Sequence, residues 1–214
     1  MIEYSDVLAG VAGYLEMDES DTELLDKFDI LNKANDAQDD LITRVPISVV
    51  STLIKSVTGN LSQDVSCYQW PSDYVRFSDL YIDYSAEITQ TNQGVEAVPT
   101  PENTFQVRSL DQRPQTEYPV YAFVAGGFEV QPAPSADQDN GFMLRYVYKI
   151  PDMVSGSQNS LLPANLKSLL IYGTVARCAA VDNYDIPMSE RFQKLFDDGI
   201  KALWGTNNDF KKGA

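Results

Sequence analysis

The chain has 214 residues, of which 43% are hydrophobic and 22% charged, and its formal net charge is −15. This length fits one domain, or one domain with a large insert, and the composition supports a hydrophobic core without disulfides or a structural metal. The sequence contains no histidine, which excludes the Ser-His-Asp and Cys-His catalytic systems. The strong negative charge argues against binding of nucleic acid through its phosphates.

Two predicted helices occupy the first part of the chain. Apolar residues at helical spacing predict a helix over residues 5–16, with Ser5 as its cap. A longer helix is predicted over residues 22–43, and Pro46 ends it.

Acidic residues are concentrated in this same region. Residues 1–40 contain 12 acidic and 2 basic residues, which is a net charge of −10. A solvated acidic helix face explains this density most simply. The alternative is a surface that lets a polyanion slide past without binding it.

The periodicity then changes to that of β-strands. Strands over residues 51–58 and 65–70 flank the turn signal Gly59-Asn60, which predicts a hairpin, and residues 75–84 predict another strand. Residues 85–104 are polar and predict a loop or short strands.

A second hairpin is predicted where residues 121–124 and 128–131 flank Ala125-Gly126-Gly127. Residues 135–141 predict a turn and residues 142–150 a strong strand. Alternation predicts that one face of this strand carries Phe142, Leu144, Tyr146 and Tyr148.

Helical periodicity returns in the last part of the chain. One helix is predicted from Pro163 to about Asp182, with small residues that let a neighbouring helix come close. The last helix is predicted to start at Pro187 and to end near Trp204-Gly205, which leaves residues 205–214 as a polar, untethered tail.

These elements predict an α+β fold, with a helical bundle formed by the N- and C-terminal helices and a β-rich, antiparallel, sandwich-like insert. The predicted parts are the N-terminal helices 1–48, the insert 49–152, the C-terminal helix pair 153–204 and a C-terminal arm 205–214. The apolar residues expected to be mostly buried are Phe28, Leu31, Leu169, Leu170, Phe192 and Leu195.

No motif points to catalysis, a cofactor or a metal. Neighbouring carboxylates, such as Asp39 with Asp40 or Asp197 with Asp198, are expected by chance in so acidic a chain. The segment 137–141 resembles a calcium loop but lacks its last glutamate, so a turn explains it better. Two reduced, buried thiols are expected at Cys67 and Cys178. We therefore expect no enzyme activity and no cofactor.

Neither end of the chain suggests export or a membrane. The first residues lack the basic and apolar regions of a signal peptide. No apolar run approaches the roughly 20 residues of a membrane span. We expect no membrane contact.

Several segments occur in an order typical of one protein family. Residues 23–38 form an acidic helix with Leu-Leu followed by Asn-x-Ala-like spacing, and residues 68–77 contain Trp-Pro-Ser-Asp-Tyr. The hairpin 121–134 ends in Pro-Ala-Pro, and the strand 142–150 precedes a proline and a helix pair. Together they resemble the head-to-tail adaptor (connector) proteins of tailed bacteriophages. The long polar stretch 85–118 and the extreme acidity depart from that pattern.

The resemblance implies a structural virion protein at the head–tail interface, made in the host cytoplasm. It implies copies assembled in a ring, expected to be a dodecamer, that docks on the portal protein and extends the DNA channel. Tail or nozzle proteins would attach to this platform, and DNA would pass without specific binding.

The same resemblance suggests residues for these contacts. The C-terminal arm would grip the portal through Trp204, Phe210, Lys211 and Lys212. The candidates for a channel-facing acidic surface are Asp18, Glu19, Asp21, Asp36, Asp39 and Asp40. Two other functions stay open: a tail-associated receptor- or carbohydrate-binding module that uses the aromatic strands, and a hydrolase of cell-wall glycans.

Overall fold

The computed structural model describes residues 1–17, 28–100, 114–154, 158–181 and 184–211, with side chains as far as Gly205 in the last range. The chain divides into two compact units. We call residues 1–53 with 149–214 the helical unit and residues 54–148 the β unit. The two units are described separately.

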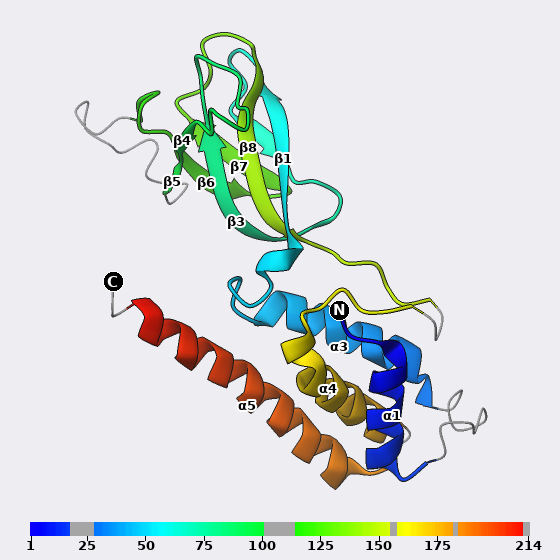
Figure 1. Ribbon diagram of the computed structural model, residues 1–214. Coiled ribbons are helices and arrows are strands. Elements are labelled where there is room, and N and C mark those ends of the chain that lie inside the picture. The colour runs from blue at the N-terminus through cyan, green and yellow to red at the C-terminus, as the bar shows by residue number, and fades with distance from the viewer. Residues whose placement is uncertain (18–27, 101–113, 155–157, 182–183, 212–214) are drawn as a thin grey trace. The chain divides into compact units, whose positions relative to one another are not determined.

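The helical unit is organised around one central helix (Figure 1). Its helices are α1 (Tyr4–Leu15), α3 (Ile30–Arg44), α4 (Lys167–Ala179) and α5 (Ile186–Lys211), with short 3-10 helices η1 (Ser51–Leu53) and η4 (Ala164–Leu166). Helix α4 packs against α1, α3 and α5. It is buried on nearly every side, since the buried residues of α4 are Leu170, Ile171, Gly173, Thr174, Val175, Ala176, Cys178 and Ala179.

Small residues make this central position possible. A β-carbon added to Gly173 would lie 2.9 Å from the Phe196 ring of α5 and 3.1 Å from the β-carbon of Ala37 in α3. A β-carbon added to Gly10 of α1 would lie 2.6 Å from the side chain of Ile171. Three helices therefore approach α4 at distances that larger side chains at these contacts would prevent.

The boundaries of the first two helices differ from those predicted. Helix α1 has Glu3 rather than Ser5 at its N-cap, without a side-chain cap bond. Helix α3 begins at Ile30 because Asp29 adopts a left-handed conformation, with φ of 48°. Both Asp29 carboxylate oxygens accept hydrogen bonds from the amide of Asn32, at 2.9 and 2.8 Å. The predicted helix 22–43 is thus not continuous, although it ends as expected just before Pro46.

The last helix is longer than predicted. Helix α5 continues through Gly205 to Lys211. Glycine stops a helix when it adopts a positive φ, and Gly205 is not among the residues of the described chain with positive φ. Once a helix has formed, each added residue costs only its own propensity, which is about 1 kcal/mol for glycine. The expected untethered tail is therefore helical up to Lys211.

The β unit contains two four-stranded sheets (Figure 1). The first has the order β1 (Ile54–Leu61), β8 (Gln138–Tyr148), β3 (Tyr74–Ile82) and β4 (Val95–Glu96). The second has the order β2 (Cys67–Gln69), β7 (Gly127–Gln131), β6 (Val120–Val124) and β5 (Val98–Pro99). Neighbouring strands are antiparallel except β5 and β6, which are parallel.

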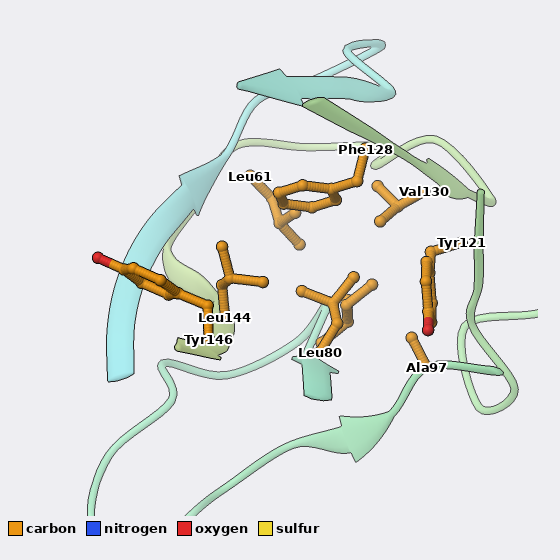
Figure 2. Packing of buried hydrophobic residues seen from close by; sticks show 9 residues of the cluster. Leu61, Leu80, Ala97, Tyr121, Phe128, Val130, Leu144 and Tyr146 are labelled. Carbon is orange, nitrogen blue, oxygen red and sulfur yellow. The ribbon is translucent and has the colours of Figure 1, made fainter. Parts of the chain in front are cut away.

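Side chains from both sheets form the core of the β unit (Figure 2). The buried members are Leu61, Leu80, Ile82, Ala97, Tyr121, Phe128, Val130, Leu144 and Tyr146. Leu144 and Tyr146 are buried and Phe142 and Tyr148 pack partly against the same core, which confirms the predicted face of the last strand. The predicted strand 75–84 and the hairpin of β6 and β7 are also confirmed.

The first predicted hairpin is wrong. Strand β1 pairs with β8, and β2 pairs with β7 in the other sheet. Gly59 lies inside β1 rather than in a turn. Glycine is needed there because a β-carbon would lie 2.2 Å from the Phe142 ring. This glycine serves close packing, which the sequence does not distinguish from a turn signal.

The predicted fold class is wrong in its arrangement. The described chain is α+β, with four helices and two sheets, but the helices do not form a bundle of N- and C-terminal helices around a β insert. Three helices surround α4, and residues 54–148 form a central β core of their own, which is mixed rather than purely antiparallel. An apolar stripe shows that a helix buries one face, but it does not show which element covers that face.

The burial predictions are partly confirmed. Phe28, Leu170 and Phe192 are buried, whereas Leu31 and Leu169 are half-buried. Leu195 is 41% exposed, because the buried stripe of α5 passes through Phe192, Phe196 and Ile200 instead.

Candidate interaction surfaces

Helix α3 carries the described half of the predicted acidic surface. Asp36 is exposed. Asp39 lies 3.4 Å from the ammonium of Lys149, and Asp40 forms an ion pair with Arg177 of α4. Asp18, Glu19 and Asp21 lie outside the described residues. Among the three described candidates, Asp36 therefore presents its charge to solvent most openly.

The ion pairs of Asp39 and Asp40 stay within the helical unit. Both join α3 to segments that come much later in the chain. Exposed ion pairs of this kind contribute about 0–1 kcal/mol, so they align these segments more than they stabilise them. They also neutralise part of the negative charge that the sequence concentrates here.

A second face of α3 holds the chain as it returns from the β unit. The buried amide of Asn35 donates to the Met153 carbonyl and accepts from the Met153 backbone N–H, both at 2.9 Å. The buried amide of Gln38 accepts a 2.6 Å hydrogen bond from the Ser160 hydroxyl and donates to the Pro151 carbonyl at 3.4 Å. We call these contacts the amide clamp.

The amide clamp was not predicted as a functional feature. Its one sequence signal is that Asn35 and Gln38 fall on the apolar stripe of a helix, where polar residues are unusual. Buried amides need partners, and here the partners are three backbone groups and the Ser160 hydroxyl, all more than a hundred residues away in sequence. Pairing of that range is not visible in the sequence.

Trp204, a candidate for portal contact, is bonded within its own unit. Its indole N–H donates to the Arg44 carbonyl at the end of α3, at 2.9 Å. The Arg44 guanidinium pairs with Asp197 and lies 5.4 Å from the centre of the Phe196 ring. Burial opposes ionisation of Asp197, but hydrogen bonds from Arg44 and Gln193 outweigh it and lower the pKa of the carboxyl.

These contacts attach α5, between Phe196 and Trp204, to the end of α3. The Trp204 side chain is still 45% exposed, so a large part of it is available to a partner. Phe210 and Lys211 belong to α5, but their side chains lie outside the described residues, as does Lys212 entirely.

In the β unit, Lys55, Asp73 and Tyr146 form a polar group. Asp73 accepts hydrogen bonds from the Lys55 ammonium at 2.8 Å and the Tyr146 hydroxyl at 2.7 Å. These bonds lower the pKa of Asp73. One carboxylate thus satisfies the polar ends of both the Lys55 and the Tyr146 side chains.

The carboxylate pairs considered for hydrolysis are engaged elsewhere. Asp39, Asp40 and Asp197 all form ion pairs with basic side chains. The calcium-like segment enters strand β8 at Gln138. Within the described ranges, no cluster of three or more His, Cys, Asp or Glu side chains is placed to hold a metal ion.

The two cysteines are both free, but only one is buried as expected. Burial raises the pKa of the Cys178 thiol to about 12, which keeps it protonated and unreactive. Cys67 is exposed on the short edge strand β2. No helix in the described part of the chain is long and apolar enough to cross a membrane.

Comparison with known protein families identifies the family of this chain. A family model described as "SU10 adaptor protein" matches residues 2–211, which include both units. The chain belongs to the SU10 adaptor protein family. No curated protein matches it. The resemblance to phage head-to-tail adaptors is thereby confirmed at the level of the family. The adaptor is accordingly a structural phage protein and a component of the virion.

Proposed function

We propose that this adaptor assembles into a ring, a dodecamer, that docks on the portal protein at the head–tail interface. The ring extends the DNA channel and gives tail or nozzle proteins a surface for attachment. The observation that carries this proposal is the family match over residues 2–211, because it includes the helical unit and the β unit together.

The charge of the chain supports passage of DNA through such a ring. A net charge of −15 repels the phosphate backbone at short range, so DNA would move without sticking. We propose that the acidic surface of Asp18, Glu19, Asp21, Asp36, Asp39 and Asp40 contributes to the channel wall. Asp36 should contribute most among the described members, because Asp39 and Asp40 already pair with basic side chains.

The end of α5 is the proposed contact with the portal. Trp204, Phe210, Lys211 and Lys212 would lie along or just beyond this helix. The hydrogen bond from Trp204 to Arg44 holds the helix on its own unit, and the helix continues for seven residues beyond Trp204. Phe210 would provide an apolar anchor, and the two lysines would pair with acidic groups of the portal.

Native mass spectrometry of the purified adaptor with its portal tests the assembly. The expected result is a portal complex that carries twelve added chains. Chains that stay monomeric with the portal would contradict the ring. A monomer that instead binds glycans would support the alternative, a tail-associated receptor- or carbohydrate-binding module.

The proposed portal contact is tested by variants at the end of α5 that remove the Phe210 side chain or reverse the charge of Lys211. We expect the Phe210→Ala and Lys211→Glu variants to lose portal binding while keeping the far-ultraviolet circular dichroism of the parent. Lys201→Glu, on the same helix and paired with Asp198, is the matched control and should bind normally. Normal binding by all three variants would remove α5 from the interface.

A further inference from the structure

An exposed aromatic ring, at the edge of the buried aromatic core of the β unit, has no role in the contacts described so far. Phe123 of β6 is 55% exposed, although large apolar side chains in sheets are usually covered. Its ring nevertheless lies 5.7 Å from Trp70, 5.3 Å from Phe77 and 5.4 Å from Tyr121, measured between ring centres. Of these neighbours Tyr121 is buried, and Trp70 and Phe77 are partly buried. We call the four residues the Phe123 patch, in which Phe123 is the exposed member.

The Phe123 patch borders an open hollow. The hollow has a volume of about 290 Å³, and it is lined by Pro99, Thr100, Tyr121, Ala122 and Phe123. Contacts with three other rings restrict the orientations open to the exposed Phe123 ring. A rigid aromatic side chain beside a hollow is typical of the anchor regions of protein interfaces.

The segments that border the hollow are negative, while Arg76 adjoins Phe77 on β3 at the other side of the patch. The described segments 95–100 and 114–124 contain Glu96 and Glu117 and no basic residue. Burial and then the charges of Asp79 and Glu96 raise the pKa of the Tyr121 phenol to about 12, so both carboxylates lie within electrostatic range of this phenol. Asp79 is already paired with Arg145, and Glu96 is exposed.

A second copy of this chain is a poor partner for such a surface. Seven basic side chains already form ion pairs with carboxylates of the same chain: Arg44, Lys55, Arg145, Lys149, Lys167, Arg177 and Lys201. A contact between two copies centred on this patch would bring their Glu96 carboxylates together, whereas the proposed ring can use other faces of the chain.

We infer that the Phe123 patch is a docking site for another protein, through a segment that carries arginine beside an apolar residue. A guanidinium stacks on an aromatic face, is weakly hydrated and pairs with carboxylates, so it matches an exposed ring next to Glu96 better than a lysine does. The apolar neighbour would enter the hollow. None of the residues proposed for the portal contact belongs to this site.

The test uses the full chain with Trp204→Phe, which leaves Trp70 as its tryptophan. Because Trp70 lies against Phe123, its emission reports on the patch. The probes are a short peptide of alternating arginine and leucine and a twin with glutamate in place of arginine. We expect saturable binding of the arginine peptide, at least about tenfold tighter than its twin. Equal binding of both peptides, or none, would overturn the inference.

Variants locate the binding. Phe123→Leu keeps an apolar side chain but removes the ring face, and Glu96→Lys reverses the nearby charge; each should weaken the arginine peptide about fivefold or more. Glu190→Lys, an exposed charge reversal on α5, should change nothing. Unchanged affinity in both patch variants would place the peptide elsewhere.

A photo-reactive benzoylphenylalanine at position 123 gives a second readout. It should crosslink to the arginine peptide and not to its twin. A crosslink that forms instead within one chain, or between two copies, would show that the adaptor itself covers the patch, and would overturn the assignment to another protein.

Discussion

The helical unit and the β unit bury their interiors with different chemistry. In the helical unit, small residues let helices approach α4, and buried amides on α3 hold the returning chain. The β unit contains no comparable buried amide contact among its described residues. Its interior combines aliphatic side chains with a continuous set of aromatic contacts, from Tyr68 through Phe128 to Phe142 and from Trp70 through Tyr74 to Tyr146.

The difference concerns specificity as well as stability. Apolar and aromatic packing stabilises in proportion to buried area and tolerates small shifts. A buried amide stabilises only when its partners are in place, so it selects one position of the returning chain. The helical unit is joined from two distant segments and uses such selective contacts, whereas the β unit is built from one continuous segment.

The largest expected effect is the loss of an aromatic ring from the β core. Phe128 is fully buried and contacts Tyr68, Trp70 and Phe142. We expect Phe128→Ala to lower the free energy of unfolding by about 3–5 kcal/mol. Single-tryptophan variants separate the units in a urea titration, since Trp70 reports on the β unit and Trp204 on the helical unit. An equal shift of both transitions would show that the units unfold together.

The amide clamp should give the next largest effect. Asn35→Leu keeps the size of the side chain but leaves the Met153 N–H and carbonyl without partners, which costs about 2–3 kcal/mol. The adjacent exposed substitution Asp36→Asn is the control and should change stability by less than about 0.5 kcal/mol. Urea unfolding followed by Trp204 measures both, and equal effects would contradict the selective role of the clamp.

Close helix approach is tested by two glycines. Gly173→Ala brings a β-carbon against Phe196 and Ala37, and we expect a loss of about 1–3 kcal/mol. Gly13→Ala meets nothing within 4 Å, so higher helix propensity should stabilise the protein by up to about 1 kcal/mol. Thermal unfolding should shift in opposite directions. If both variants shifted the melting temperature in the same direction, the close approach of helices to α4 would not require glycine at position 173.

The smallest expected effect is a pH dependence in the β unit. Hydrogen bonds from Lys55 and Tyr146 lower the pKa of Asp73, so its contribution is present above the unfolded pKa of about 4. That contribution is lost as the pH falls through the lower folded pKa. In the Asp73→Asn variant, we expect the free energy of unfolding of the β unit to fall less steeply as the pH is lowered from 6 to 2. Urea titrations followed through Trp70 measure this free energy at each pH. If the variant and the parent differed by the same free energy of unfolding at every pH, other carboxylates would cause the pH dependence.

The sequence alone determined the type of most elements and the family. Alternation identified the face of β8, the Ala-Gly-Gly turn identified the hairpin of β6 and β7, and Pro46 marked the end of α3. These features depend on neighbouring residues only, so a linear pattern contains them. The ordered set of segments also indicated a phage adaptor, in agreement with the family match.

Tertiary structure decided which elements meet. In the sequence, Gly59 indicates a turn and Gly205 the end of a helix. In the structure, Gly59 lies against the Phe142 ring and Gly205 lies inside α5. The partners of Asn35 and Gln38, the central place of α4 and the exposed ring of Phe123 all depend on segments far apart in the chain. A local pattern shows which apolar side chains must be buried and which polar groups need hydrogen-bond partners. Only the folded chain determines which residues bury them or bond to them.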